Sequence, residues 1–252
     1  MGLSGNFGTV KLGRVNTNAL DAWGVGSVFG TAIGSGYGSN GNIYTRYSAT
    51  GTATAQSAPT RFNGAVRYES PVFNGFSGSV LVVPKAKDTD VQSVTDIGLR
   101  YTNGPLNVMY ASQTIKQDGA VTTSFTTGTG TTLALAAGEK NKLNILSANY
   151  TFGAATVYGA YWTEKQAAAV DAKSYMLGGK YVIGATTLMA SVGNNNDKLT
   201  ANVDKKIYGL GADYALSKRT ALYARYDVRD ADSVSAADDK TKRTAFGVRH
   251  TF

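Results

Sequence analysis

Arginine and aspartate are the side chains with the clearest potential for chemistry, and their spacing favours steering of ions over catalysis. Arg61 and Arg67 share one parity of an extended segment, and Arg100 has the same inward parity in a later segment. Arg14 breaks the parity of its own segment and precedes a long polar stretch, 15–60, whose single acidic residue is Asp21. Because guanidinium groups with few opposing carboxylates concentrate small anions, these five residues are the candidate ion-steering residues.

The sequence offers little for catalysis, metal binding or cofactor binding. Cysteine is absent, and the single histidine, His250, falls on the outward parity of the last segment. A serine–histidine or zinc site needs a histidine inside a pocket with partners. The stretch 36–41 matches G-x-G-x-x-G but lacks the strand–turn–helix context of a nucleotide site. We therefore expect no enzymatic activity, no cofactor and no metal.

Two weaker signals have a plainer interpretation beside the functional one. The aromatic residues of the stretch 15–60 form either a slide for sugars or aromatic solutes or, more simply, a surface that packs this stretch against the rest of the fold. Pairs of loop acids are either Ca²⁺ ligands or merely hydrated carboxylates. These residues are Trp23, Tyr37, Tyr44 and Tyr47, and Asp88, Asp90, Asp238 and Asp239.

Composition narrows the class of protein. The chain has 252 residues and a formal charge of +8, but its Lys and Arg residues are scattered singly, which argues against nucleic acid as a partner. No run of 18 apolar residues exists, so a membrane-spanning helix is not expected. The first 20 residues contain no basic and then apolar leader, so we expect no secretory signal peptide.

Alternation with a period of two residues predicts an all-β fold. From Arg61 onward, polar and apolar residues alternate in segment after segment, which is typical of strands with two different faces. Counting from Thr9, about 12 strands are expected. Short and long connections between them alternate strictly, as in an antiparallel up-and-down transmembrane β-barrel. We expect a single domain over residues 1–252.

The last stretch carries the signature of membrane assembly. Phe246, Val248, His250 and Phe252 occupy every second position, so an aromatic and aliphatic stripe lies on one face of the final strand. A terminal phenylalanine in the interfacial girdle is typical of the strand that closes a transmembrane barrel.

Three stretches resemble the general porins of β-proteobacterial outer membranes. They are Leu3–Arg14 (LSGNFGTVKLGR), Leu216–Tyr223 (LSKRTALY) and Gly247–Phe252 (GVRHTF), and the resemblance extends over almost the whole chain. It implies a 16-stranded trimeric pore whose third extracellular loop, here 15–60, folds inward and narrows the channel. It also places Arg61 where the family has an arginine in the constriction wall. The implied function is diffusion of small hydrophilic solutes and ions, often with a preference for anions.

One feature departs from the family pattern. In these porins, LSGNFG belongs to the end of the fourth strand, so we expect this chain to lack roughly the first three strands. A sheet of 12 strands from Thr9 could close with antiparallel edges, whereas a thirteenth strand over 2–6 would require one parallel pair. The alternatives are a truncated gene product, a partial chain or a shortened barrel.

Together these observations predict a passive outer-membrane channel, integral to the membrane and preferring anions. Expected partners are small anions and hydrophilic solutes, outer-membrane lipid with lipopolysaccharide, and two further copies in a homotrimer. The alternative is a structural barrel that scaffolds a partner protein and conducts little. A third interpretation, a soluble β-protein, is disfavoured because the outward positions carry Phe, Val, Leu and Tyr without Lys or Arg.

Overall fold

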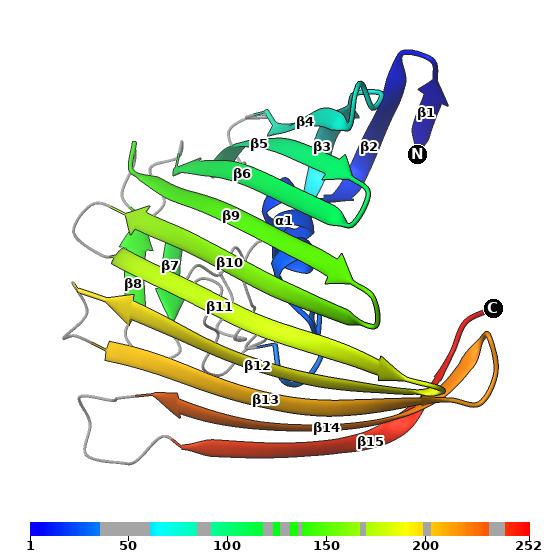
Figure 1. The fold of residues 1–252 in the computed structure, drawn as a ribbon. Helices are drawn as coiled ribbons and strands as arrows, with labels where there is room; N and C mark the ends of the chain where they lie inside the picture. Colours follow the sequence, from blue (N-terminus) through cyan, green and yellow to red (C-terminus); the bar gives the residue numbers. More distant parts are fainter. Residues whose placement is uncertain are drawn as a thin grey trace.

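The fold is one curved antiparallel sheet of 13 strands that follow one another in sequence order (Figure 1). The computed structural model describes residues 1–35, 61–84, 92–117, 123–126, 132–135, 138–166, 170–198, 203–231 and 240–252. The strands of the sheet are β1 (Gly2–Gly5), β2 (Gly8–Asn16), β3 (Arg61–Glu69), β4 (Phe76–Val83), β5 (Gln92–Asn103), β6 (Leu106–Gln117), β9 (Lys140–Phe152), β10 (Ala155–Gln166), β11 (Val170–Ile183), β12 (Thr186–Asp197), β13 (Val203–Ala215), β14 (Thr220–Ala231) and β15 (Thr241–His250). The expected all-β class is confirmed. The count exceeds the expected 12 by one because Gly2–Gly5 pairs with β2.

Two elements lie outside this sheet. Helix α1 (Asn18–Gly26) belongs to the stretch 15–60, and strands β7 (Thr123–Thr126) and β8 (Thr132–Leu135) pair only with each other. In the described part of the chain, no helix has the length and apolar character needed to cross a membrane.

Short turns gather at one end of the sheet and long connections at the other (Figure 1). Gly104 and Gly184 adopt φ values of 53° and 57° in two of the short turns, a conformation that favours glycine. One long connection, predicted from the alternation over 165–173, is shorter, since β10 continues to Gln166 and β11 begins at Val170. Strand pairing extends past the apolar part of each strand, which the alternation alone does not reveal.

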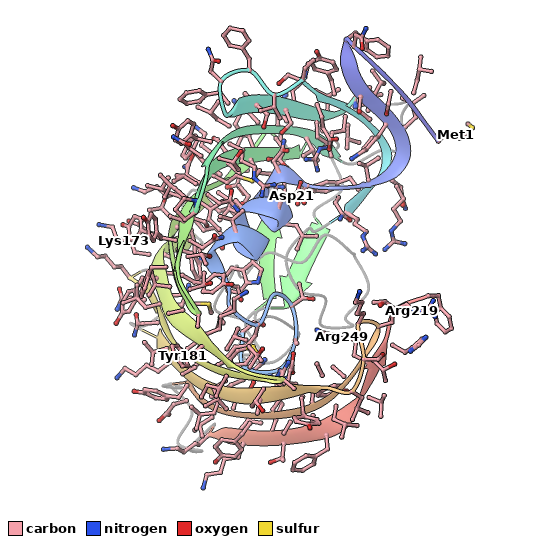
Figure 2. The ribbon with its side chains drawn as sticks, turned by 45° about the vertical axis from the view of Figure 1, so that its right-hand side comes forward. Met1, Asp21, Lys173, Tyr181, Arg219 and Arg249 are labelled. Carbon is pink, nitrogen blue, oxygen red and sulfur yellow. The ribbon has the colours of Figure 1, made fainter. Side chains whose placement is uncertain are left out.

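The two faces of the sheet differ as the alternation predicts. On the convex face, apolar side chains such as Leu177 and Leu210 expose 57% and 58% of their surface. On the concave face, residues of the same strands, such as Met176 and Ile207, are fully buried. Figure 2 shows Tyr181 on the convex side and Asp21 of α1 inside the curl of the sheet.

The prediction that outward positions lack Lys and Arg is wrong at the end of the sheet with the long connections. Lys140, Lys142, Lys165 and Lys173 are exposed and alternate with buried concave residues. They face outward because the strands run beyond the apolar band into a region that we predicted as loops.

The edges of the sheet are β1 and β15. Among the described residues, no strand pairing joins these two edges. Because the strands are antiparallel and their number is odd, β1 and β15 run in the same direction.

Candidate functional site

The concave face is organised around α1. Thr17 caps the helix, since its hydroxyl accepts a hydrogen bond from the backbone N–H of Leu20 at 3.1 Å. Asp21 lies in the first turn, where the helix dipole favours an acidic side chain. The local sequence therefore favours a helix that starts after Thr17, although we expected an irregular loop over this stretch.

One side of α1 packs against the wall of the sheet. Ala19, Ala22 and Trp23 are fully buried and join a cluster with wall residues that include Ile145 and Trp162. The rings of Trp23 and Trp162 meet edge to face at 5.2 Å. Trp23 thus packs the segment against the wall, the plainer of its two predicted roles, whereas Tyr37, Tyr44 and Tyr47 lie outside the described residues.

The start of α1 is anchored to β5 by a buried carboxylate. Asp96 accepts a hydrogen bond from the backbone N–H of Asn18 at 2.7 Å, and the Asn18 side-chain amide donates to the Asp96 backbone carbonyl at 2.8 Å. Ser79 of β4 donates to Asn18 at 2.5 Å. Gly98 makes this approach feasible, because a Cβ there would lie 2.9 Å from the Asn18 side chain.

A second buried carboxylate anchors the segment that follows α1. The backbone N–H of Gly34 donates to Asp227 of β14 at 2.9 Å, and Ser191 of β12 donates to the Gly34 carbonyl at 2.7 Å. Arg243 of β15 forms hydrogen bonds with both carboxylate oxygens of Asp227. Residues 17–35, hereafter the inner segment, are therefore fixed to both halves of the sheet.

A polar hollow of about 730 Å³ lies between α1 and strands β3 to β6. Arg61, Arg67, Arg100 and Asp21, four of the five candidate ion-steering residues, line it together with Glu69. Residues far apart in the sequence are thus brought together beside α1.

The three arginines of the hollow have different partners. Arg67 is buried and forms ion pairs with Asp21 at 2.6 Å and Glu69 at 3.0 Å. Arg61 and Arg100 are exposed, and each donates its Nε–H to an asparagine carbonyl: Arg61 to Asn16 at 2.6 Å and Arg100 to Asn107 at 2.9 Å. Neither has an ion pair with a described acidic residue.

Two predictions about the arginines need correction. Arg61 and Arg67 do not share an uninterrupted alternation, because a bulge shifts the register of β2 and β3 between Gly13 and Val15, and Gly64 adopts a φ of 63°. Arg61 reaches the hollow from the first position of its strand. Arg14 does not line this hollow; it lines an adjacent one of about 350 Å³, which Asp21, Arg67 and Glu69 also border.

The terminal stripe faces outward as predicted. Phe246 and Val248 expose 77% and 63% of their surface on the convex face, and Phe252 is fully exposed. His250 Nδ1 lies 2.9 Å from the Thr220 hydroxyl, and its ring meets that of Phe252 edge to face at 5.0 Å. This arrangement gives His250 no pocket among the described residues.

The anchors Asp96 and Asp227 are functional candidates that the sequence interpretation missed. Both lie on the concave face, but parity alone does not distinguish an anchoring carboxylate from any other inward charge. Among the described residues, no group of three His, Cys, Asp or Glu side chains could hold a metal ion. The acid pairs Asp88/Asp90 and Asp238/Asp239 lie outside the described residues.

Comparison with known proteins gives a consistent result. The sequence pattern of the family described as Gram-negative porin matches residues 1–233. An outer membrane porin protein of Bordetella pertussis is 27% identical over 99% of this chain and 70% of its own length. The major outer membrane protein P.IB of Neisseria lactamica is 33% identical over 44% of this chain. That match spans only 29% of the Neisseria protein.

Solved structures share the fold. OmpT of Vibrio cholerae, in a form with loop L8 deleted, superposes with a TM-score of 0.73 at 19% identity, over 99% of this chain and 77% of that one. An anion-selective porin from Comamonas acidovorans superposes with a TM-score of 0.69 at 20% identity, over 100% of this chain and 76% of that one.

Proposed function

Because this chain belongs to the Gram-negative porin family, we propose that it is an integral outer-membrane channel for passive diffusion of small hydrophilic solutes and ions, with a preference for anions. The observation that carries the proposal is the contrast between the two faces of the sheet. The convex face exposes apolar side chains, as a surface in contact with lipid does. The concave face holds the polar hollow beside α1, which offers a path for water and solutes.

The preference for anions rests on the charges of the hollow. Its described lining has three basic residues, Arg61, Arg67 and Arg100, and two acidic ones, Asp21 and Glu69. Both acids pair with Arg67, and Glu69 also pairs with Lys11 at 2.8 Å, so Arg67 and Lys11 balance the two carboxylates. The uncompensated positive charge of the described lining is then that of Arg61 and Arg100. A charge about 4 Å from a permeating ion changes its energy by about 1 kcal/mol in water and by about 4 kcal/mol at an effective dielectric of 20.

Replacement of Arg61 tests this proposal. We expect Arg61→Ala, and more strongly Arg61→Glu, to lower the Cl⁻/K⁺ permeability ratio in planar bilayers, by about tenfold at low salt for the stronger change. The matched control is Arg219→Glu, because Arg219 lies in an exposed short turn outside the hollow (Figure 2). Equal shifts of the reversal potential in both variants would show that diffuse charge sets the preference, and absence of current in the unmodified protein would refute the channel.

Assembly as a homotrimer is part of the proposal. OmpT of Vibrio cholerae, folded in vitro, has been described in a trimer form. At 19% sequence identity, the similarity between that protein and this chain is a similarity of fold.

Lipopolysaccharide is the lipid partner that the convex face favours. Five lysines, Lys116, Lys140, Lys142, Lys165 and Lys173, are exposed at its end with the long connections, and Figure 2 shows Lys173 pointing away from the sheet. Lys116 is directly opposite Lys140, and Lys142 is directly opposite Lys165. Like charges that face each other across strands are destabilising, and the pair of Lys165 with Asp171 at 3.7 Å offsets this only in part. A phosphate group between the lysines would therefore stabilise this surface.

One observation favours the second candidate function, a structural barrel that conducts little. The inner segment packs against the wall through a dry apolar cluster and leaves no passage behind α1 among the described residues. These side chains therefore block a solute path between α1 and the wall. Single-channel conductance separates the candidates, since a scaffold would show little current in bilayers that contain folded protein.

A further inference from the structure

Gly24 occupies an unusual position for a glycine. It lies in the last turn of α1, on the side of the helix that faces the hollow, where Leu20 and Asp21 also lie. Its surface is exposed, whereas Ala22 and Trp23 beside it are fully buried against the wall. Of the two glycines in α1, the helix therefore presents the exposed one, Gly24, to the proposed path of the solutes.

Neither the backbone nor the packing of α1 requires glycine at this position. A Cβ added to Gly24 would meet no heavy atom within 4 Å, and Gly24 is not among the residues with positive φ. Gly26, two residues later, is different, since its Cβ would lie 2.6 Å from the Cβ of Ala160. Because glycine inside a helix is less favourable than alanine, its presence at position 24 opposes the stability of α1.

We propose that Gly24 is a specificity-determining residue of the channel. The missing side chain keeps the hollow wide at the point where α1 faces the charged wall, and so sets the largest solute that can pass. The inference rests on the proposed channel function. It also predicts that a charge placed at position 24 acts directly on permeating ions, because Asp21, Arg61 and Arg67 line the same hollow.

The absence of cysteine from the sequence allows a direct test. In Gly24→Cys, the introduced thiol is the only one, and it can be modified in the folded protein with negatively or positively charged methanethiosulfonate reagents. We expect either reagent to lower single-channel conductance by about twofold or more, because pore width limits the current. The two reagents should shift the Cl⁻/K⁺ permeability ratio in opposite directions, by about tenfold between them at low salt.

Two single-cysteine variants serve as matched controls. Ala22→Cys places the thiol on the buried side of the same helix, so we expect no modification. Leu177→Cys places it on the convex face, with 57% of the native side chain exposed, so modification in detergent should leave the conductance unchanged.

The outcomes separate this inference from the proposed function. If the unmodified protein conducts but Gly24→Cys is not modified, or is modified without a change in current, the inference is wrong and the channel proposal stands. If the unmodified protein does not conduct, the channel proposal fails and the inference fails with it. If Gly24→Cys folds poorly, Gly24→Ser in a liposome swelling assay replaces it, with slower entry expected only for the largest permeating solutes; an unchanged size dependence would overturn the inference.

Discussion

At the scale of single residues, hydrogen-bonding partners decide how much of each arginine charge a solute experiences. Arg67 is buried between two carboxylates, those of Asp21 and Glu69, whereas Arg61 and Arg100 are held by neutral amides. A formal count of basic residues on the concave face therefore overstates the positive potential. The electrostatic potential of the hollow depends on a few side chains. Replacement of Asp21 by a neutral residue is the most direct way to make this potential more positive.

We expect Asp21→Asn to increase the preference for anions. The change removes the partner 2.6 Å from Arg67 and leaves Arg67 with Glu69 alone, a carboxylate that it shares with Lys11. The Cl⁻/K⁺ permeability ratio should rise by up to about tenfold at low salt and by less when salt shortens the screening length to about 3 Å at 1 M. The measurement is the reversal potential across a salt gradient. The matched control is Asp171→Asn, whose carboxylate pairs with Lys165 at 3.7 Å at the end of the sheet with the long connections; a similar shift in the control would contradict the prediction.

At the scale of elements, α1 is a docked part of the wall rather than a loose loop. Its buried side supplies apolar contact, and Asp96 and Asp227 hold the inner segment at two places about half the sheet apart. Such a segment keeps one position only if both the apolar contact and the hydrogen bonds persist. The anchors can be tested one at a time.

Asp96→Asn should loosen α1 without unfolding the sheet. The Asp96 carboxylate accepts from the Asn18 backbone at 2.7 Å and from the Gln113 side chain at 3.3 Å. A hydrogen bond of this kind contributes about 0.5–1.5 kcal/mol, so local opening of residues 18–26 should become roughly twofold to tenfold more frequent. Deuterium exchange measured by mass spectrometry reports this opening. Unchanged exchange over 18–26, with β9 and β10 as internal references, would show that the apolar contact alone fixes the helix.

The lysines at the end of the convex face lead to a prediction about lipid. The double variant Lys142→Gln, Lys165→Gln removes two charges that lie directly opposite each other. If lipopolysaccharide phosphates bind there, its retention on the purified protein should fall, since each basic residue near an anionic lipid surface contributes about 1 kcal/mol. Lys180→Gln is the control. Lys180 lies over the ring of Tyr158 at 5.9 Å, and in β11 its parity is opposite to that of the outward Lys173. Equal retention in the double variant and the unmodified protein would refute the assignment.

At the scale of the whole molecule, period-two alternation carried most of the fold prediction. It predicted which face of β5 or β11 would be buried, because each strand separates lipid from the lumen. It did not predict where strand pairing ends. The backbones of Lys165 and Lys173 belong to the ladder between β10 and β11, because strand pairing depends on the backbone and not on apolar side chains.

The site was predictable only as a set of candidates. Composition, parity and the family resemblance singled out Arg61, Arg67, Arg100 and Asp21, and these four line one hollow, although a bulge interrupts the parity between Arg61 and Arg67. The docking of α1 was not predictable, because Asn18 and Asp96 are 78 residues apart and Gly34 and Asp227 are 193 apart. No local pattern of residues encodes such contacts.

The odd number of strands raises the question of how the sheet avoids open edges in a membrane. Strands β1 and β15 run in the same direction, so an all-antiparallel closure requires an odd number of further strands between them. Unpaired backbone groups in lipid cost several kcal/mol each, which disfavours an open edge at β15. In membranes we therefore expect the backbone amides of β15 that point away from β14 to be paired, whatever polypeptide supplies the partner.

Deuterium exchange along Thr241–His250 tests this expectation. In protein kept in lipid, the amides at the free edge of β15 should exchange nearly as slowly as those paired with β14. Their exchange should be at least about a hundredfold slower than in an unpaired strand, because each 1.4 kcal/mol of stabilisation makes opening about tenfold rarer. The short turn at 216–219 provides a fast-exchanging reference. If only the amides that point toward β14 exchange slowly, the other edge of β15 is unpaired and the prediction is wrong. The strand would then have to lie outside the hydrocarbon layer.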